Sequence, residues 1–160
     1  MTTNSVTLDN GRHYSSRFGL AAAVNLSLVP LDAINGIVPQ CKHHIQRALD
    51  FAGSHTVADV CADLREGKAQ LWIAGDGDTV DGIVVTTVTQ YPQRKECFIW
   101  LLAGERGSAY SWMTINDMLG EIEAWAKALG CDLVSLEGRS GWERVLPEYE
   151  KTKVILEKRL

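Results

Sequence analysis

The residues with the clearest chemical potential lie in the last third of the chain, between a short apolar strand and a long amphipathic helix. The strand is expected over residues 98–102, and it runs into the loop Gly104-Glu105-Arg106-Gly107-Ser108-Ala109. A loop that ends at a helix N-terminus presents unpaired backbone N–H groups and the positive end of the helix dipole, which together favour an anion such as a phosphate. A second interpretation needs no ligand, because a loop glycine often only turns the chain.

Four strands lead up to this loop. Runs of β-branched and other apolar residues predict strands over residues 23–29, 70–74, 80–89 and 96–102. Glycine and aspartate at positions 75–78, and proline at position 92, predict the turns between the last three strands. The last three of these strands should therefore form an antiparallel meander.

Two helical regions are expected between the first strand and the second. Apolar residues recur at helical spacing over residues 31–49, and Pro39 should divide this stretch into two helical pieces. Thr56 and Asp59 have the spacing of a capping box, so a short helix should begin there and end at Gly67.

The helix after the loop has the strongest pattern in the chain. It is expected over about residues 114–129, with Gly130 as its stop signal. Its apolar face comprises Ile115, Met118, Leu119, Ile122, Trp125, Ala126 and Leu129. A strand over residues 132–136, a short helix over residues 142–146 capped by Ser140, and a last strand over residues 152–158 are expected to follow.

Composition excludes several classes of function. The formal net charge is −4 with both signs dispersed, so no nucleic acid is expected as a ligand. The four cysteines form no C-x-x-C pair, which favours reduced core thiols over a zinc or dithiol site. His43-His44 begins no metal-ligand spacing, so both side chains are expected at solvent-facing or half-buried helix positions and no metal is expected. No apolar run approaches the roughly 20 residues of a membrane span, and a cytoplasmic protein is expected.

The chain length of 160 residues suits one domain. Residues 1–22 are polar and lack a hydrophobic period, so they are expected to form a flexible arm. Residues 23–160 are expected to form the domain, with the element order β, α, α, β, β, β, α, β, α, β.

This order, with a glycine loop between the fourth strand and the third helix, resembles the GNAT superfamily of acyl-coenzyme A N-acyltransferases. Three segments are more narrowly similar to GNAT-like proteins of tailed phages and prophages. These are Leu71-Trp72-Ile73-Ala74, Glu123-Ala124-Trp125-Ala126, and the stretch from Glu137 to Leu146 that reads EGRSGWERVL. The resemblance implies an α/β (α+β) fold with a mixed, mostly antiparallel central sheet flanked by helices.

The resemblance also implies where acetyl-CoA would bind. The fourth and fifth strands should splay apart, and the pantetheine arm should pair with backbone of the fourth strand, which includes Leu102. The pyrophosphate should lie in the following loop, formed by Arg106, Gly107, Ser108, Ala109 and Tyr110. This loop keeps a basic residue and a glycine but lacks the family's three-residue offset between them.

Amine acylation needs a base near the splay, and a carboxylate can supply it. Glu137, at the end of the fifth strand, and Glu96, at the start of the fourth, are the first candidates, with Glu105 as a third. Each could equally be an ordinary surface carboxylate. The family often places an acidic tyrosine at the start of the last short helix, where this chain has Trp142, which cannot act as an acid.

Two functions are therefore open. The first is an acyl-CoA dependent N-acyltransferase of an unknown amine, located in the cytoplasm. The second is a noncatalytic phage virion or virion-associated component, in which the fold is an assembly scaffold. In that case residues 1–20 would contact virion proteins or other copies in a homo-oligomer.

Overall fold

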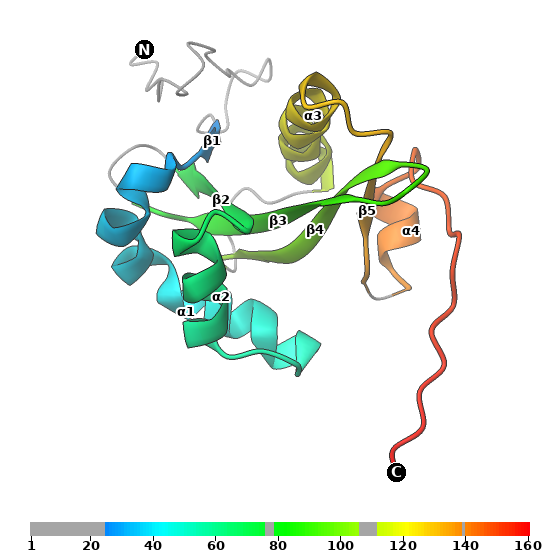
Figure 1. Ribbon diagram of the computed structural model, residues 1–160, viewed down its shortest axis with the longest axis horizontal. Helices are drawn as coiled ribbons and strands as arrows, with labels where there is room; N and C mark the ends of the chain where they lie inside the picture. Colours follow the sequence, from blue (N-terminus) through cyan, green and yellow to red (C-terminus); the bar gives the residue numbers. More distant parts are fainter. Residues whose placement is uncertain (1–24, 76–78, 106–111, 139) are drawn as a thin grey trace.

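The protein is built on one five-stranded sheet, with strand order β1-β2-β3-β4-β5, in a computed structural model that describes residues 25–75, 79–105, 112–138 and 140–160. The strands are β1 (Asn25–Leu28), β2 (Ala69–Gly75), β3 (Gly82–Gln90), β4 (Lys95–Gly104) and β5 (Leu133–Leu136). The first four pair as an antiparallel meander, and β5 joins β4 in parallel (Figure 1). The expected mixed, mostly antiparallel sheet is confirmed.

One face of the sheet is covered by α1 (Ile34–Ala52), which follows the 3-10 turn η1 (Leu31–Ala33), and by α2 (Val57–Arg65). Apolar side chains from these helices, such as Ile45 and Leu64, are fully buried against the sheet. The prediction that Pro39 divides α1 was wrong, because the helix is continuous through it. Pro39 has no N–H to donate to the carbonyl oxygen of Asn35, four residues earlier. Both residues lie on the exposed side of the helix, where water can donate to that oxygen instead.

The start of α2 is fixed by local hydrogen bonds, as expected. The Thr56 hydroxyl accepts a hydrogen bond from the backbone N–H of Asp59, and the Asp59 carboxylate accepts one from the backbone N–H of Thr56 at 2.7 Å. Past the helix, Gly67 has a φ of +72°, which confirms its role in ending this segment.

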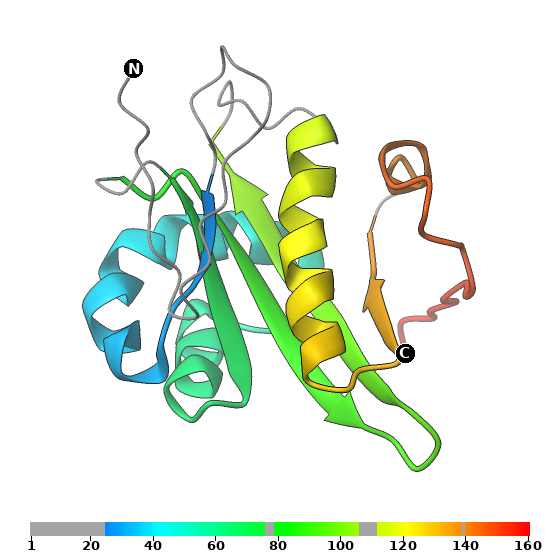
Figure 2. The same ribbon diagram turned by 90° about the horizontal axis from the view of Figure 1, so that it is seen from above.

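The other face of the sheet is covered by α3 (Trp112–Ala128) and the short α4 (Trp142–Val145), as the turned view shows (Figure 2). Four residues of the predicted apolar face of α3 are fully or almost fully buried, namely Met118, Leu119, Ile122 and Ala126. The ring of Trp125 meets that of Trp72 edge-on, with centroids 5.3 Å apart. Leu129 lies beyond the last residue of α3 and is exposed, so it does not belong to this face.

Two predictions near the C-terminus were wrong. Residues 152–158 form no strand, and Val154, Ile155 and Leu156 are all exposed. A run of apolar residues becomes a strand only where a neighbouring strand accepts its hydrogen bonds, and in this structure none pairs with it. Ser140 does not cap α4, because Gly141 occupies the N-cap position and no side chain bonds to the helix end.

The four cysteines are free thiols, three of them buried, which confirms the expectation of reduced core residues. Burial raises the pKa of the Cys41 thiol to about 11, with a smaller contribution from Cys61. Among the described residues, no helix has the length and apolar character needed to cross a lipid bilayer. The arm expected over residues 1–22 lies outside the described residues, which begin with β1. The boundary between arm and domain therefore stays a prediction.

Candidate functional site

The central feature of the site is a β-bulge in β4 at Trp100. On the β3 side, Thr86 pairs with Ile99 and Val85 pairs with Leu101, so Trp100 is the extra residue. On the β5 side, pairing runs from Glu96, opposite Leu133, to Ile99, opposite Leu136, and stops there. Within the described residues, positions 100–104 of β4 thus have no strand partner on this edge. A bulge bends its strand, which explains why β4 leaves β5 at this point.

The bulge divides β4 into a paired end, residues 95–99, and an open end, residues 100–104. Cys97 and Ile99 at the paired end belong to the core under α3. Because strand side chains alternate, Glu96, Phe98 and Trp100 lie on the opposite face, which α1 and α2 cover in part. Phe98 and Trp100 are half-buried, and the ring of His55 contacts that of Trp100 edge-on, with centroids 4.9 Å apart. An aromatic strip therefore leads from the bulge towards Glu96.

Glu96 is a buried carboxylate with partners on both sides. The Ser135 hydroxyl of β5 donates a short hydrogen bond to its Oε1, and Arg94 forms an ion pair with its Oε2 at 3.2 Å. These contacts satisfy both oxygens and hold the side chain in one position. A carboxylate held in this way has the geometry of a positioned base.

The structure does not bring Glu137 and Glu96 together. Glu137 directly follows β5 and is exposed, whereas Glu96 pairs with the first residue of that strand. Four residues of extended chain separate their positions along β5, or roughly 13 Å. Glu137 therefore lies level with the bulge, and Glu96 lies at the far end of the paired segment.

Of the residues expected to bind acetyl-CoA, the structure describes only Leu102. Leu102 lies on the open end of β4 and is half-buried against the core under α3. Arg106, Gly107, Ser108, Ala109 and Tyr110 lie outside the described residues, so their predicted role is untested. Gly138 packs against Trp142, and a Cβ on Gly138 would come within 2.5 Å of that indole. This confirms that Trp142 packs under the strand-to-helix turn.

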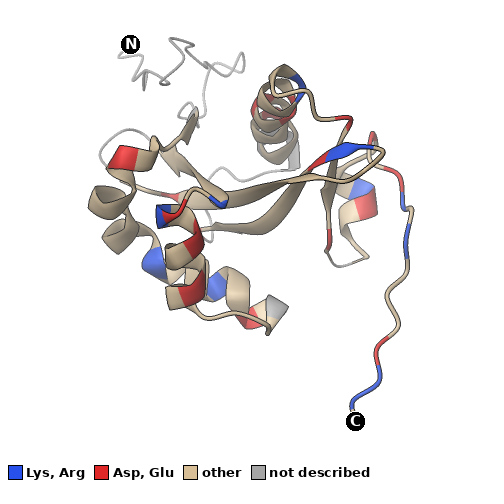
Figure 3. Ribbon diagram, in the orientation of Figure 1, with Lys and Arg blue, Asp and Glu red and all other residues tan. Residues whose placement is uncertain are grey.

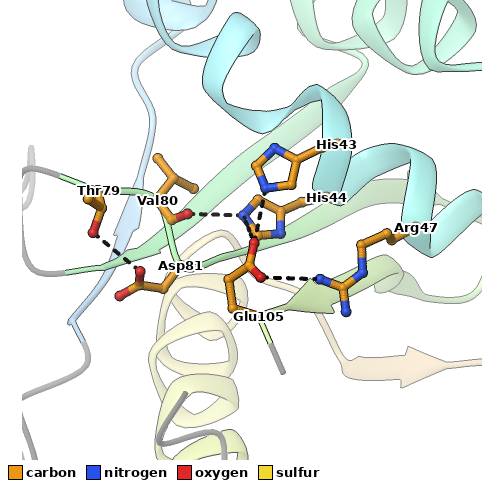
Figure 4. Close-up of polar contacts among 7 residues, drawn as sticks. All are labelled: His43, His44, Arg47, Thr79, Val80, Asp81 and Glu105. Carbon is orange, nitrogen blue, oxygen red and sulfur yellow. Dashed lines mark hydrogen bonds and ion pairs between the residues drawn. The ribbon is translucent and has the colours of Figure 1, made fainter. Parts of the chain in front are cut away.

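A second group of polar side chains surrounds Glu105, the residue that follows β4. His43, His44 and Arg47 of α1 all point towards its carboxylate (Figure 4). The Nε2 atoms of His43 and His44 lie 3.1 Å and 3.8 Å from Oε1, and Arg47 lies 3.7 Å from Oε2. Sequence reasoning missed this cluster, because 62 positions separate His43 from Glu105. The only sequence signal was the pair of adjacent histidines.

His44 departs from its expected solvent-facing or half-buried position, because its side chain is fully buried. Its Nε2 donates a hydrogen bond to the carbonyl oxygen of Val80 at 3.0 Å. Its Nδ1 is buried and has no hydrogen-bond partner among the described residues. His43 is 58% exposed, as expected, and lines an open cavity of about 560 Å³ between α1 and α2.

Charged residues are mixed over the surface rather than gathered by sign. Both signs occur on α1, on α2 and at the β3–β4 hairpin (Figure 3). The described residues present no basic stripe of the kind that binds nucleic acid, in line with the charge pattern of the sequence.

Comparisons with known proteins bear on the architecture. No family model matches the sequence, and no curated protein sequence is significantly similar to it. Solved structures do match. A GCN5-related N-acetyltransferase from Ralstonia eutropha superposes with a TM-score of 0.63 and 12% identity, over 86% of this chain and 99% of that one.

The chain has the GNAT fold. An aminoglycoside acetyltransferase from an uncultured soil metagenomic sample, crystallised with sisomicin, gives a TM-score of 0.64 at 11% identity, over 86% of this chain and 96% of that one. A predicted acetyltransferase from Clostridium acetobutylicum, crystallised with acetyl-CoA, gives 0.60 at 14% identity, over 85% and 96%. At such identities the likeness shows the GNAT fold alone. The resemblance to phage proteins stays a prediction.

Proposed function

We propose that this protein is an acyl-CoA dependent N-acyltransferase that acetylates an amine. The observation that supports this best is the departure of β4 from β5 at the Trp100 bulge. A strand edge without a partner offers alternating N–H and C=O groups to an extended ligand. The amide-containing pantetheine arm of acetyl-CoA is such a ligand, and it would pair with residues 100–104, including Leu102. Residues Arg106 to Tyr110 would then hold the pyrophosphate.

Glu96 is the proposed base. The amine nitrogen attacks the thioester carbonyl, a C–N bond forms, and the C–S bond breaks. Glu96 takes the proton that the nitrogen loses, and the departing thiolate takes a proton from solvent. Its burial and the aromatic strip that leads to it from the bulge support this role. Glu137 is the second candidate, because it lies level with the bulge.

Turnover measurements distinguish these two carboxylates. Glu96→Gln keeps an oxygen for the Ser135 hydroxyl but cannot accept a proton, so we expect kcat to fall by roughly 10²- to 10⁴-fold. Binding of acetyl-CoA, measured by calorimetry, should be unchanged. Glu137→Gln is the matched control on the neighbouring strand. If Glu137→Gln loses turnover and Glu96→Gln does not, the base is Glu137.

Binding of acetyl-CoA tests the proposal as a whole. Wild-type protein should bind acetyl-CoA, and Gly107→Val should abolish that binding while leaving Tm nearly unchanged, because the added side chain would block the approach of the pyrophosphate. A wild-type protein that neither binds acetyl-CoA nor releases free coenzyme A with any of a panel of amines would contradict the proposal. That result would favour the noncatalytic virion component instead.

A further inference from the structure

We propose that His43, His44 and Glu105 form a binding site for a divalent transition-metal ion, with Zn²⁺ as its natural class. The two imidazole Nε2 atoms and one carboxylate oxygen all lie within 4.8 Å of one another. They come from two elements, α1 and the end of β4, that converge on one point (Figure 4). The site adjoins the proposed pyrophosphate loop, because Glu105 directly precedes Arg106, but none of its three ligands takes part in the proposed acyl transfer.

The distances suit a common metal centre. Metal–ligand bonds of about 2.0 to 2.2 Å place neighbouring ligand atoms roughly 3.0 to 3.5 Å apart in tetrahedral or octahedral geometry. Glu105 Oε1 lies 3.1 Å from His43 Nε2 and 3.8 Å from His44 Nε2. A side-chain adjustment of less than about 1 Å therefore brings the three atoms onto one ion.

Two neighbouring groups contact the ligand atoms. The Val80 carbonyl oxygen lies 3.0 Å from His44 Nε2 and accepts its ring N–H, so an ion on this nitrogen would take the place of that hydrogen bond. Arg47 lies 3.7 Å from Oε2 of Glu105, whereas the two histidines face Oε1. Contacts of this kind to the far oxygen orient a ligating carboxylate.

The burial of His44 favours ion binding. Its side chain has no exposed surface, so it gives up little rotamer freedom on binding an ion. Without an ion, Nε2 carries the ring proton and Nδ1 has no partner among the described residues. With an ion, the proton lies on Nδ1, and a metal–nitrogen bond replaces the Val80 hydrogen bond. His43 and Glu105 are 58% and 48% exposed, so an ion can reach the site from solvent.

The ligand set selects the class of ion. Imidazole nitrogens suit zinc, cobalt, nickel and copper, whereas Mg²⁺ and Ca²⁺ prefer sites made of oxygen alone. Two histidines among the three donors therefore favour a transition-metal ion over Mg²⁺ and Ca²⁺. A bound Zn²⁺ would link α1 to the last residues of β4 and should raise Tm.

Calorimetric titration of full-length, metal-stripped protein with Zn²⁺ tests this site, with Co²⁺ absorption as a second readout. We expect micromolar or tighter Zn²⁺ binding, visible Co²⁺ bands and no response to Mg²⁺. His43→Ala and Glu105→Gln should each weaken Zn²⁺ binding at least tenfold and remove the Zn²⁺-dependent rise in Tm. Both substitutions alter half-exposed side chains, so both variants should fold.

His55→Ala is the matched control, because His55 is an exposed histidine that bonds to Ser54 and lies outside the cluster. It should bind Zn²⁺ as the wild type does. The proposal is overturned if wild-type protein does not bind Zn²⁺, if both cluster variants bind it with wild-type affinity, or if Mg²⁺ binds equally well. None of these readouts uses acyl transfer, so the two proposals can fail separately.

Discussion

The two ends of β4 each carry a carboxylate, and the two are held in opposite ways. Glu96, at the paired end, is buried and bonded to a hydroxyl of the adjacent strand and to a nearby arginine. Glu105, just past the open end, is 48% exposed, and its partners come from a helix far away in the sequence. Strand pairing therefore fixes one carboxylate, and packing of α1 on the sheet brings partners to the other.

This difference has a functional meaning. The paired end holds its groups rigidly, as a catalytic base requires, while the open end has a backbone edge without a strand partner among the described residues. The bulge at Trp100 separates the paired end of β4 from its open end. Substitutions on the two sides of the bulge should therefore lower the free energy of unfolding by different amounts.

The largest difference is expected in the core. Ile99 at the paired end is almost fully buried, so Ile99→Ala should lower the free energy of unfolding by about 2 to 5 kcal/mol. Leu102 at the open end is only half-buried, and Leu102→Ala should cost about 1 kcal/mol. Urea denaturation of both variants measures the two costs. Equal costs would mean that the open end is as tightly packed as the paired end.

An intermediate difference is expected between the carboxylates. Glu96→Ala leaves the Ser135 hydroxyl without its acceptor and should cost about 1 to 3 kcal/mol. Glu105→Ala removes half-exposed ion pairs that water screens, so it should cost less than about 1 kcal/mol. Thermal unfolding without added metal compares the two. If Glu105→Ala loses more stability than Glu96→Ala, then Glu105, and not Glu96, is the more firmly held carboxylate.

The last effect is absent at neutral pH and is expected only at high pH. Burial, with smaller contributions from Cys131 and Glu96, raises the pKa of the Cys97 thiol to about 12 from a usual 9.0. Below the usual value the thiol is neutral in both states. As the pH rises above it, the unfolded chain ionises first, so stability should fall between about pH 9 and pH 12.

The variant Cys97→Ala should reduce this loss of stability at high pH. Cys131→Ala removes only a smaller contribution to the Cys97 pKa, so it should change this loss less than Cys97→Ala does. An identical pH dependence of the unfolding free energy in wild type and Cys97→Ala would show that the paired end does not protect this thiol.

Much of the fold follows from short-range patterns. The capping box at Thr56, the apolar stripe of α3 and the antiparallel strands of the meander were each predicted, and the structure confirms them. Of the site, the sequence predicted Glu96 and Glu137 as candidates near the two strand ends. It did not predict that Glu96 is paired with Ser135 and Arg94, because those contacts depend on the register between β4 and β5.

Local chemistry and periodicity determined the elements by themselves, because helix caps, turns and amphipathic stripes depend on neighbours within a few residues. Only the tertiary structure decided the rest. It kept α1 continuous through Pro39 by placing that residue on the exposed side, and it left the apolar tail without a strand partner. It also placed His43 and His44 against Glu105. His43 and Glu105, 62 positions apart, meet because α1 packs on the sheet. That packing depends on many side chains together, so no short motif predicts it.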